Sequence, residues 1–138
     1  MSYLLDTNVI SETIKNKPSK NLHEWFEKIS EEDLFISVLT LGEIRRGVEL
    51  LDNIKKKSTL IAWLEKDLRN RFGDRILSID NVIADRWGYS CAYSAKTLPV
   101  IDSLIAATAL THNLKLVTRN TKDFVEIKDL ELVNPFSS

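Results

Sequence analysis

The segment YLLDTNVISE, residues 3–12, decides the fold class of this chain. Residues 3–5 form an uninterrupted apolar run, which is typical of a short strand buried on both faces. The run ends at Asp6, Thr7 and Asn8, and a helical pattern of apolar residues follows it. Asp6 therefore lies at the carboxyl end of a first strand, the edge where open α/β sheets bind ligands. We expect this carboxylate to belong to a functional site.

Short apolar runs and amphipathic helical patterns alternate along the rest of the chain. Parallel strands need long crossover connections, so this alternation predicts an α/β fold with a mostly parallel sheet of four to five strands and helices on both faces. The length favours one domain, residues 1–138. Strands are predicted at residues 3–5, 34–38, 75–79 and 115–118, with a weaker one at 131–133. Helices are predicted at residues 8–15, 22–29, 40–51, 58–69 and 101–112 and in a long segment capped by Asp80, with a loose turn at residues 52–57.

The cysteine content and the N-terminus bear on the compartment. Cys91 is the only cysteine, so no disulfide can form within the chain, which is typical of a reducing compartment. The first residues do not combine a basic region with an apolar one, and no apolar run approaches the roughly 20 residues that span a bilayer. We expect a cytoplasmic protein without a membrane partner.

Charge bears on nucleic-acid binding. The formal net charge is -1, so no overall positive field attracts nucleic acid, and any contact with RNA or DNA must use a local basic patch. The alternative is that the basic residues form solvated helix faces and a turn. The candidate RNA-binding residues are Arg45, Arg46, Lys55, Lys56 and Lys57, and Arg69, Arg71 and Arg75 extend the same part of the chain.

Four acidic residues lie near predicted strand ends or helix starts: Asp6, Glu43, Asp102 and Asp123. Each also has a purely structural explanation. Asp6 is a favourable helix cap, and Glu43 forms a capping-box pattern with Thr40. Asp102 lies in the first turn of a predicted helix, where a negative charge is favourable, and Asp123 fits a surface turn or a cap. Taken singly, none of the four establishes a site.

Taken together, the four acids indicate a metal site. Three follow predicted strands directly or through a tight turn, and Asp102 shares a helix face with the small residues Ala106 and Ala109, which lets that helix approach the sheet edge. Two carboxylates about 4 Å apart repel by about 4 kcal/mol at an effective dielectric constant near 20, a large part of a domain's stability. Converging carboxylates therefore need a cation. Oxygen ligands suit Mg²⁺ or Mn²⁺, and the sequence has no Cys and His set with zinc spacing.

Four segments follow one another in order along nearly the whole chain: YLLDTNVISE at residues 3–12, SVLTLGEIRRG at 37–47, LPVIDSLIAATAL at 98–110 and LKLVTRNTKDF at 114–124. Together they resemble the PIN-domain family, most closely the VapC-type ribonuclease toxins and their FitB-like branch. The resemblance implies a PIN-like three-layer α/β/α fold. It places the acidic quartet of the family on Asp6, Glu43, Asp102 and Asp123, and its polar supporting positions on Thr7, Asn8, Thr118 and Asn120.

The resemblance also implies an activity and partners. The activity is Mg²⁺-dependent hydrolysis of RNA phosphodiester bonds, with Mn²⁺ as a second suitable ion, leaving a 3′-hydroxyl and a 5′-phosphate. Asp6 and Asp102 would bind the ion directly or through water, while Glu43 and Asp123 would act through water or at a second ion. The implied biological role is the toxin of a type II toxin–antitoxin system. The implied partners are a VapB-type antitoxin and a second copy of the chain in a homodimer.

Other classes of acidic or nuclease site fit less well. A receiver-like signalling domain needs paired acids after its first strand, and a haloacid-dehalogenase-type phosphatase needs Asp-x-Asp there, whereas this chain has Asp6, Thr7 and Asn8. A metal-free nuclease would use a pair of imidazoles, but His23 lies on an amphipathic helix and His112 at a predicted helix end, where capping is the commoner role. The remaining alternative is a PIN module that binds nucleic acid or a partner without turnover.

Overall fold

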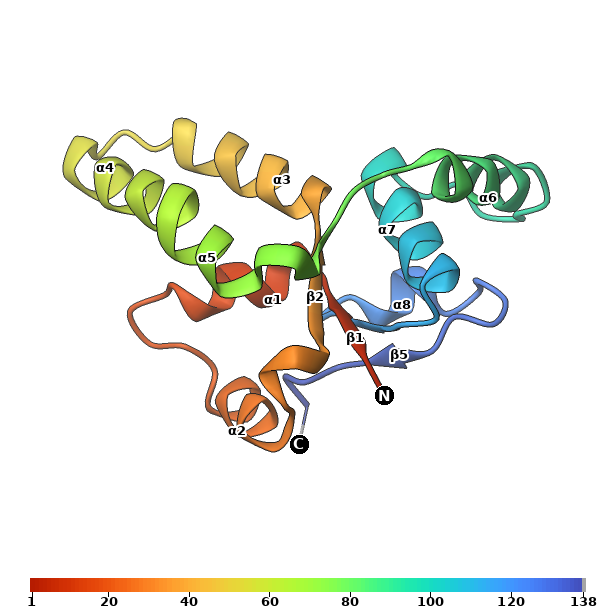
Figure 1. Ribbon diagram of the computed structural model, residues 1–138, viewed down its shortest axis with the longest axis horizontal. Helices are drawn as coiled ribbons and strands as arrows, with labels where there is room; N and C mark the ends of the chain where they lie inside the picture. The colour runs from red at the N-terminus through yellow and green to blue at the C-terminus, as the bar shows by residue number, and fades with distance from the viewer. Residues whose placement is uncertain (138) are drawn as a thin grey trace.

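Five parallel strands form a sheet at the centre of the structure, a computed structural model that describes residues 1–137 (Figure 1). Their order across the sheet is β3-β2-β1-β4-β5, and all four pairings are parallel. Helices cover both faces of the sheet, so the predicted three-layer α/β fold is confirmed. The strands are β1 (Tyr3–Leu5), β2 (Leu34–Ser37), β3 (Ile76–Leu77), β4 (Lys115–Val117) and β5 (Leu132–Val133).

The central strand β1 supplies both hydrophobic cores. Side chains alternate between the two faces of a strand, so Leu4 packs on one face and Leu5 on the other. The cluster around Leu4 includes the buried residues Ala106 and Ala109. We predicted that the helix carrying these small residues would approach the sheet. All three residues of β1 are buried, so the prediction of a strand covered on both faces is confirmed.

One long helical segment lies in the middle of the chain. A π-helical turn at Trp63–Leu68 joins α4 to α5, so one continuous helical segment runs from Ile54 to Phe72. The α-helices are α1 (Thr7–Thr13), α2 (Lys20–Lys28), α3 (Val38–Glu49), α4 (Ile54–Ala62), α5 (Arg69–Phe72), α6 (Asn81–Ala92), α7 (Val100–Thr111) and α8 (Thr121–Phe124), and 3₁₀ turns lie at Glu31–Asp33 and Gly73–Arg75.

Helix α4 begins earlier than predicted. Asn53 is its N-cap, since the Asn53 side-chain oxygen accepts a hydrogen bond of 3.0 Å from the backbone N–H of Lys56. The prediction of a loose turn through residue 57 is therefore wrong. A side-chain cap followed by lysines, which are good helix formers, is sufficient to start the helix there.

Helix α3 also begins earlier than predicted. Ser37 is its N-cap, and the Ser37 hydroxyl accepts a hydrogen bond of 3.0 Å from the backbone N–H of Leu39. Thr40 lies within the first turn and is fully buried, so the capping-box interpretation of Thr40 and Glu43 is wrong. Glu43 instead lies in the second turn of α3.

The cap predicted at Asp80 is confirmed. Asp80 accepts a hydrogen bond of 2.9 Å from the backbone N–H of Ile83 and starts α6. Strand β3 is shorter than the predicted 75–79. The 3₁₀ turn that begins at Gly73 (φ 49°) includes Arg75, and β3 is an edge strand paired only with β2. Within residues 1–137, none of the helices has the length and apolar composition needed to cross a bilayer.

Candidate metal centre

Asp6 joins the end of β1 to the start of α1. Its backbone N–H donates to the carbonyl of Val117 at 2.9 Å, which continues the pairing with β4 beyond the strand itself. One carboxylate oxygen, Oδ1, accepts a hydrogen bond of 2.8 Å from the backbone N–H of Thr7, so Asp6 is the N-cap of α1. The other oxygen, Oδ2, accepts a hydrogen bond of 2.8 Å from the hydroxyl of Thr118. The expected helix cap is therefore confirmed for Asp6, and the second carboxylate oxygen is held by Thr118.

Burial and hydrogen bonding act on Asp6 in opposite directions. The side chain is only 6% exposed, and this burial raises the pKa of its carboxyl group above the usual value. The hydrogen bonds from Thr118 and Thr7 lower the pKa, while the nearby charge of Glu43 raises it again. The hydrogen bonds that the protein supplies therefore do not fully offset the cost of burying the negative charge of Asp6.

Asn8, in α1, and Thr118, which follows the neighbouring strand β4, support Asp6. The side-chain N–H of Asn8 donates to the Thr118 hydroxyl at 3.2 Å and lies 3.4 Å from Asp6 Oδ2. The Thr118 hydroxyl also accepts a hydrogen bond of 3.1 Å from the backbone N–H of Asn120. Thr118 is fully buried, so its hydroxyl has no competing water. The side chains of Asn8 and Thr118 therefore lie beside the Asp6 carboxylate, whereas Asn120 contacts Thr118 through its backbone N–H.

Glu43 reaches the same edge from α3. The Thr7 hydroxyl donates a short hydrogen bond to Glu43 Oε1 and lies 3.2 Å from the hydroxyl of Thr40. Thr7 therefore contacts two of the four acids, since its N–H donates to Asp6 and its hydroxyl donates to Glu43. Thr40 belongs to this set although the sequence suggested only a cap for it. Its spacing of three from Glu43, which places both on one face of a helix, was the available signal.

Asp102 is where the acidic charges meet. It lies in the first turn of α7, as predicted, and is half-buried. Its carboxyl pKa is raised to about 6, first by burial and then by the negative charges of Asp6, Glu43 and Asp123. Asp6, Glu43 and Asp123 therefore all act electrostatically on Asp102.

Asp123 is the most exposed of the four. It lies in α8, and its backbone N–H donates to the carbonyl of Asn120 at 3.0 Å, so the turn after β4 sets its position. The structure gives its carboxylate no fixed partner among the described residues, but its charge reaches Asp102. Its position is thus tied to the same turn that carries Thr118.

The donor set fits a hard divalent cation bound in part through water. All four groups are carboxylates, the ligands that Mg²⁺ and Mn²⁺ prefer, and a cation would relieve the repulsion that raises the pKa of Asp102. Within residues 1–137, no three His, Cys, Asp or Glu side chains are gathered closely enough to enclose an ion by themselves. The acids therefore do not form a closed cage of protein ligands within the described residues.

Comparison with known families identifies the fold. A model of the PIN domain matches residues 3–130, which is most of the chain. The chain belongs to the PIN-domain family. This membership excludes the receiver-like and dehalogenase-type alternatives, which belong to other families.

Several relatives of this PIN domain are similar over nearly their whole length. The toxin FitB of Neisseria gonorrhoeae is 38% identical over 136 residues, covering 96% of this chain and 97% of that protein. The VapC ribonuclease Y4jK of Sinorhizobium fredii is 31% identical over 136 residues, covering 96% of each chain. The crystal structure of FitAcB from Neisseria gonorrhoeae superposes with a TM-score of 0.90 at 36% identity, covering 99% of both chains. The predicted resemblance to FitB and VapC toxins is confirmed.

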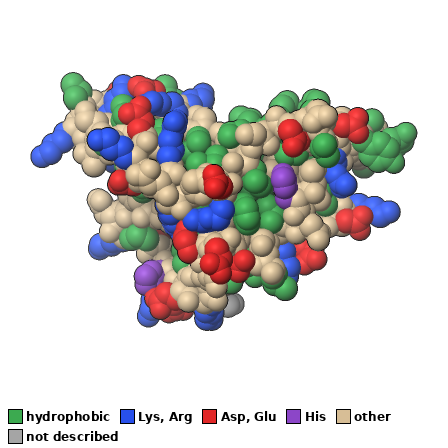
Figure 2. Space-filling view, in the orientation of Figure 1, with side chains coloured by type: hydrophobic (Ala, Val, Ile, Leu, Met, Phe, Trp, Pro, Cys, Tyr) green, Lys and Arg blue, Asp and Glu red, His purple; other side chains and the backbone are tan. Residues whose placement is uncertain are grey.

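The basic residues near the PIN centre divide into two groups. Lys and Arg side chains gather over α3, α4 and α5 in the space-filling view (Figure 2). Arg45 forms ion pairs with Glu49 at 3.3 Å and with Glu65 at 2.6 Å, and Lys57 forms one with Glu49 at 3.3 Å. Arg46, Lys55 and Lys56 are exposed, and no ion pair of theirs is found within residues 1–137.

A cavity of about 350 Å³ lies between α1, α3 and α4. Glu43, one of the four acids, and Lys56, one of the exposed basic residues, both line it. Arg71 and Arg75, by contrast, form ion pairs with Glu31, which precedes β2 at the amino end of the strands.

Proposed function

We propose that this PIN domain is the toxin of a type II toxin–antitoxin system and hydrolyses RNA as a metal-dependent endoribonuclease. The observation that carries the proposal is the convergence of charge on Asp102, whose pKa is raised to about 6 by burial and three other carboxylates. Strongly perturbed carboxyl groups in an acidic cluster mark functional sites. Two relatives that carry the names of a toxin and a ribonuclease support the same activity.

The proposed ligands of the ion are Asp6 and Asp102, directly or through water, with Glu43 and Asp123 acting through water or at a second ion. Mg²⁺, or Mn²⁺ in its place, suits these oxygen donors because it keeps several waters in an octahedral shell. A bound ion would supply a more acidic water molecule and positive charge beside the reacting phosphate. The expected products carry a 3′-hydroxyl and a 5′-phosphate.

The protein's own contribution is to orient the carboxylates before the ion and RNA arrive. The Thr118 hydroxyl and the Thr7 N–H fix the two oxygens of Asp6, and the Thr7 hydroxyl fixes Glu43. Groups that orient metal ligands in this way typically change metal affinity or activity by about 10–100-fold when removed. Thr7 and Thr118 therefore orient the carboxylates of Asp6 and Glu43.

The proposed RNA contacts are Arg46, Lys55 and Lys56, which are exposed and carry no ion pair in the described part of the chain. Lys56 lines the cavity that Glu43 also borders, so a phosphate held by Lys56 would lie next to the acidic centre. Arg45 and Lys57 contribute less directly, because Glu49 neutralises part of their charge. The proposed protein partners are a VapB-type antitoxin and a second copy of the chain.

A direct test compares cells that express the wild-type protein with cells that express Asp102→Asn. New RNA ends carrying a 5′-phosphate are expected only with the wild type, because the substitution removes a carboxylate at the point where the four charges meet. Asp67→Asn is the matched control, since it makes the same chemical change at an exposed residue of the π-helical turn. It should cleave like the wild type.

One observation favours a second candidate, a PIN module that binds RNA or a partner without turnover: no closed set of three metal-ligating side chains exists within residues 1–137. That candidate predicts identical RNA end profiles for wild type and Asp102→Asn. It also predicts that Asp6→Asn leaves growth inhibition intact. Either result would contradict the ribonuclease proposal.

A further inference from the structure

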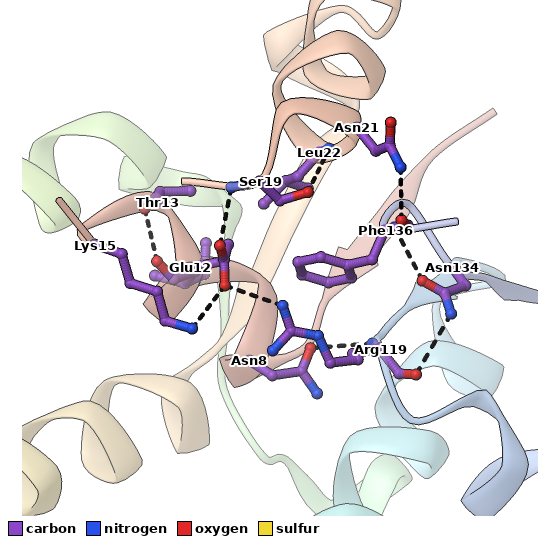
Figure 3. Close-up of polar contacts among 11 residues, drawn as sticks. Asn8, Glu12, Thr13, Lys15, Ser19, Asn21, Leu22, Arg119, Asn134 and Phe136 are labelled. Carbon is purple, nitrogen blue, oxygen red and sulfur yellow. Dashed lines mark hydrogen bonds and ion pairs between the residues drawn. The ribbon is translucent and has the colours of Figure 1, made fainter. Parts of the chain in front are cut away.

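Glu12 is a buried acid that the proposed chemistry does not use. It lies near the end of α1 and is only 5% exposed. Its Oε1 atom lies 2.9 Å from Nζ of Lys15 and 3.0 Å from Nη2 of Arg119, and its Oε2 atom accepts a hydrogen bond of 2.9 Å from the backbone N–H of Ser19 (Figure 3). Both carboxylate oxygens of Glu12 therefore have partners, which offsets the free-energy cost of burying a charge.

Arg119 is held on two further sides. Its guanidinium group lies over the ring of Phe136, 3.9 Å from the ring centroid, and Figure 3 places the group between that ring and Asn8. The Phe136 carbonyl in turn accepts a hydrogen bond of 2.9 Å from the side chain of Asn21 in α2. A charged group that is paired and stacked in this way has few rotamers left.

The backbone of Arg119 is tied to the acidic centre. The Arg119 N–H donates to the Asn8 side-chain oxygen at 3.2 Å, and the other end of the same Asn8 amide reaches the Thr118 hydroxyl. Thr118 binds Asp6, and the turn that follows sets the start of α8 and the position of Asp123. The segment 118–120 is therefore held from one side by Asn8 and from the other by Glu12.

We propose that the Glu12–Arg119 pair, covered by Phe136, positions the turn after β4, so that Thr118 meets Asp6 and Asp123 stays beside the metal centre. Glu12 and Arg119 are thus positioning residues that act through Thr118 and Asp123. The effect on the metal ion rests on the proposed function, whereas the effect on the turn does not.

Plain stability does not account for this arrangement. The Arg119 side chain is 44% exposed, so solvent screens its charge and weakens its ion pair with Glu12. Neutralising Glu12 does not require Arg119 either, because Lys15 pairs with the same oxygen. What Arg119 adds and Lys15 does not is a connection to the segment 118–120.

This difference supplies a matched pair of variants. Arg119→Met and Lys15→Met each remove one cation from Glu12 Oε1 and leave an unbranched side chain in its place. Amide hydrogen exchange of the metal-free proteins is measured over residues 118–124, and Mn²⁺ affinity is measured by calorimetry. Arg119→Met is expected to raise exchange over this segment and to weaken Mn²⁺ binding by about tenfold. Lys15→Met should change neither quantity.

Arg119→Lys serves as the conservative variant and is expected to lie between Arg119→Met and the wild type, because it keeps the charge but loses the planar group that stacks on Phe136. Equal exchange in wild type and Arg119→Met, or equal increases in Arg119→Met and Lys15→Met, would overturn the proposal. Faster exchange with unchanged Mn²⁺ affinity would overturn the positioning role. If the wild type binds no Mn²⁺ and cuts no RNA, the proposed function fails, while the exchange comparison still decides whether the pair holds the turn.

Discussion

The hydroxyl of Thr118 donates a hydrogen bond of 2.8 Å to Oδ2 of Asp6, across 112 residues of sequence. The two residues follow neighbouring parallel strands, β4 and β1, whose backbones pair directly. Because both groups are buried, the contact has no water to replace it. The hydrogen bond fixes the orientation of the Asp6 carboxylate, the first candidate site residue in the sequence.

Thr118→Val is expected to lower the free energy of unfolding by about 1–2 kcal/mol, because a buried carboxylate loses a donor. It should also weaken Mn²⁺ binding about tenfold. Chemical denaturation and calorimetry measure the two effects. Thr111→Val, which removes a hydroxyl bonded to the Ala107 carbonyl of α7, is the control and should leave Mn²⁺ affinity unchanged.

Asp102→Asn is expected to stabilise the metal-free protein at neutral pH. The folded-state pKa of Asp102 is about 6 against 3.8 for the isolated group, so the folded state binds more protons between these values. The free energy of unfolding of the wild type therefore falls as pH rises from about 4 to about 6 and stays lower above it. At pH 7.5 the variant should be more stable by about 1 kcal/mol after allowing for solvent screening. Denaturation with a chelator present tests this, and a gap that fails to narrow toward pH 4 would contradict it.

Divalent ions should stabilise the wild type. At an ion concentration 100 times the dissociation constant, the gain is about 2.7 kcal/mol, or roughly 10 °C in melting temperature for a chain of this size. The shift should shrink at pH 5, where protonation of Asp102 competes with the ion. Thermal melts with and without Mn²⁺ measure it. The proposed site requires that Asp6→Asn lose most of the shift, and an unchanged shift would place the ion elsewhere.

Reversing two charges at the start of α4, Lys55→Glu with Lys56→Glu, should weaken binding of single-stranded RNA. If both lysines contact phosphates, the slope of log affinity against log salt concentration falls by about 1.4. Acids in a first helical turn are favourable, so the fold should tolerate the change. Binding is measured in an Asp102→Asn background to prevent cleavage. Lys20→Glu with Lys28→Glu, at exposed positions of α2, is the control and should keep the wild-type slope.

Glu31→Gln is expected to affect stability without affecting RNA cleavage. Burial raises the pKa of the Glu31 carboxyl, but Arg71 and Arg75 lower it more, so the net pKa lies below the usual value. The resulting stabilisation is present above the ordinary pKa of 4.5 and is lost as pH falls through the lowered value. The substitution should cost at most about 1 kcal/mol, since these side chains are partly exposed. Slower RNA cleavage would show that the amino ends of the strands matter for activity.

Local patterns in the sequence were sufficient for the strands and for several caps. An apolar run such as residues 3–5 can be stable only where both faces are covered, and a side chain such as Asp80 binds an N–H three residues away. The start of α3 was misplaced because Thr40 with Glu43 and Ser37 with Leu39 both fit local capping rules. Burial of Thr40, which depends on α1 packing against α3, decided between them.

The ion pairs between residues far apart in the sequence could not be predicted from local patterns. Arg71 and Arg119 are both basic residues within polar stretches, yet one binds Glu31 and the other binds Glu12. Both contacts join residues 40 or more positions apart. Such contacts depend on which strands are neighbours, and hydrophobic periodicity does not encode the strand order.

The sequence by itself determined the α/β class, the burial of residues 3–5 on both faces, and the choice of four candidate acids, three of which act electrostatically on Asp102. Those properties follow from hydrophobic pattern and from the rule that parallel strands end together. Only the tertiary structure decided that Thr7 joins Asp6 to Glu43 and that Glu12 holds Arg119. The reason is that hydrogen bonds and ion pairs act over about 3 Å, a range within which only the folded chain brings distant residues.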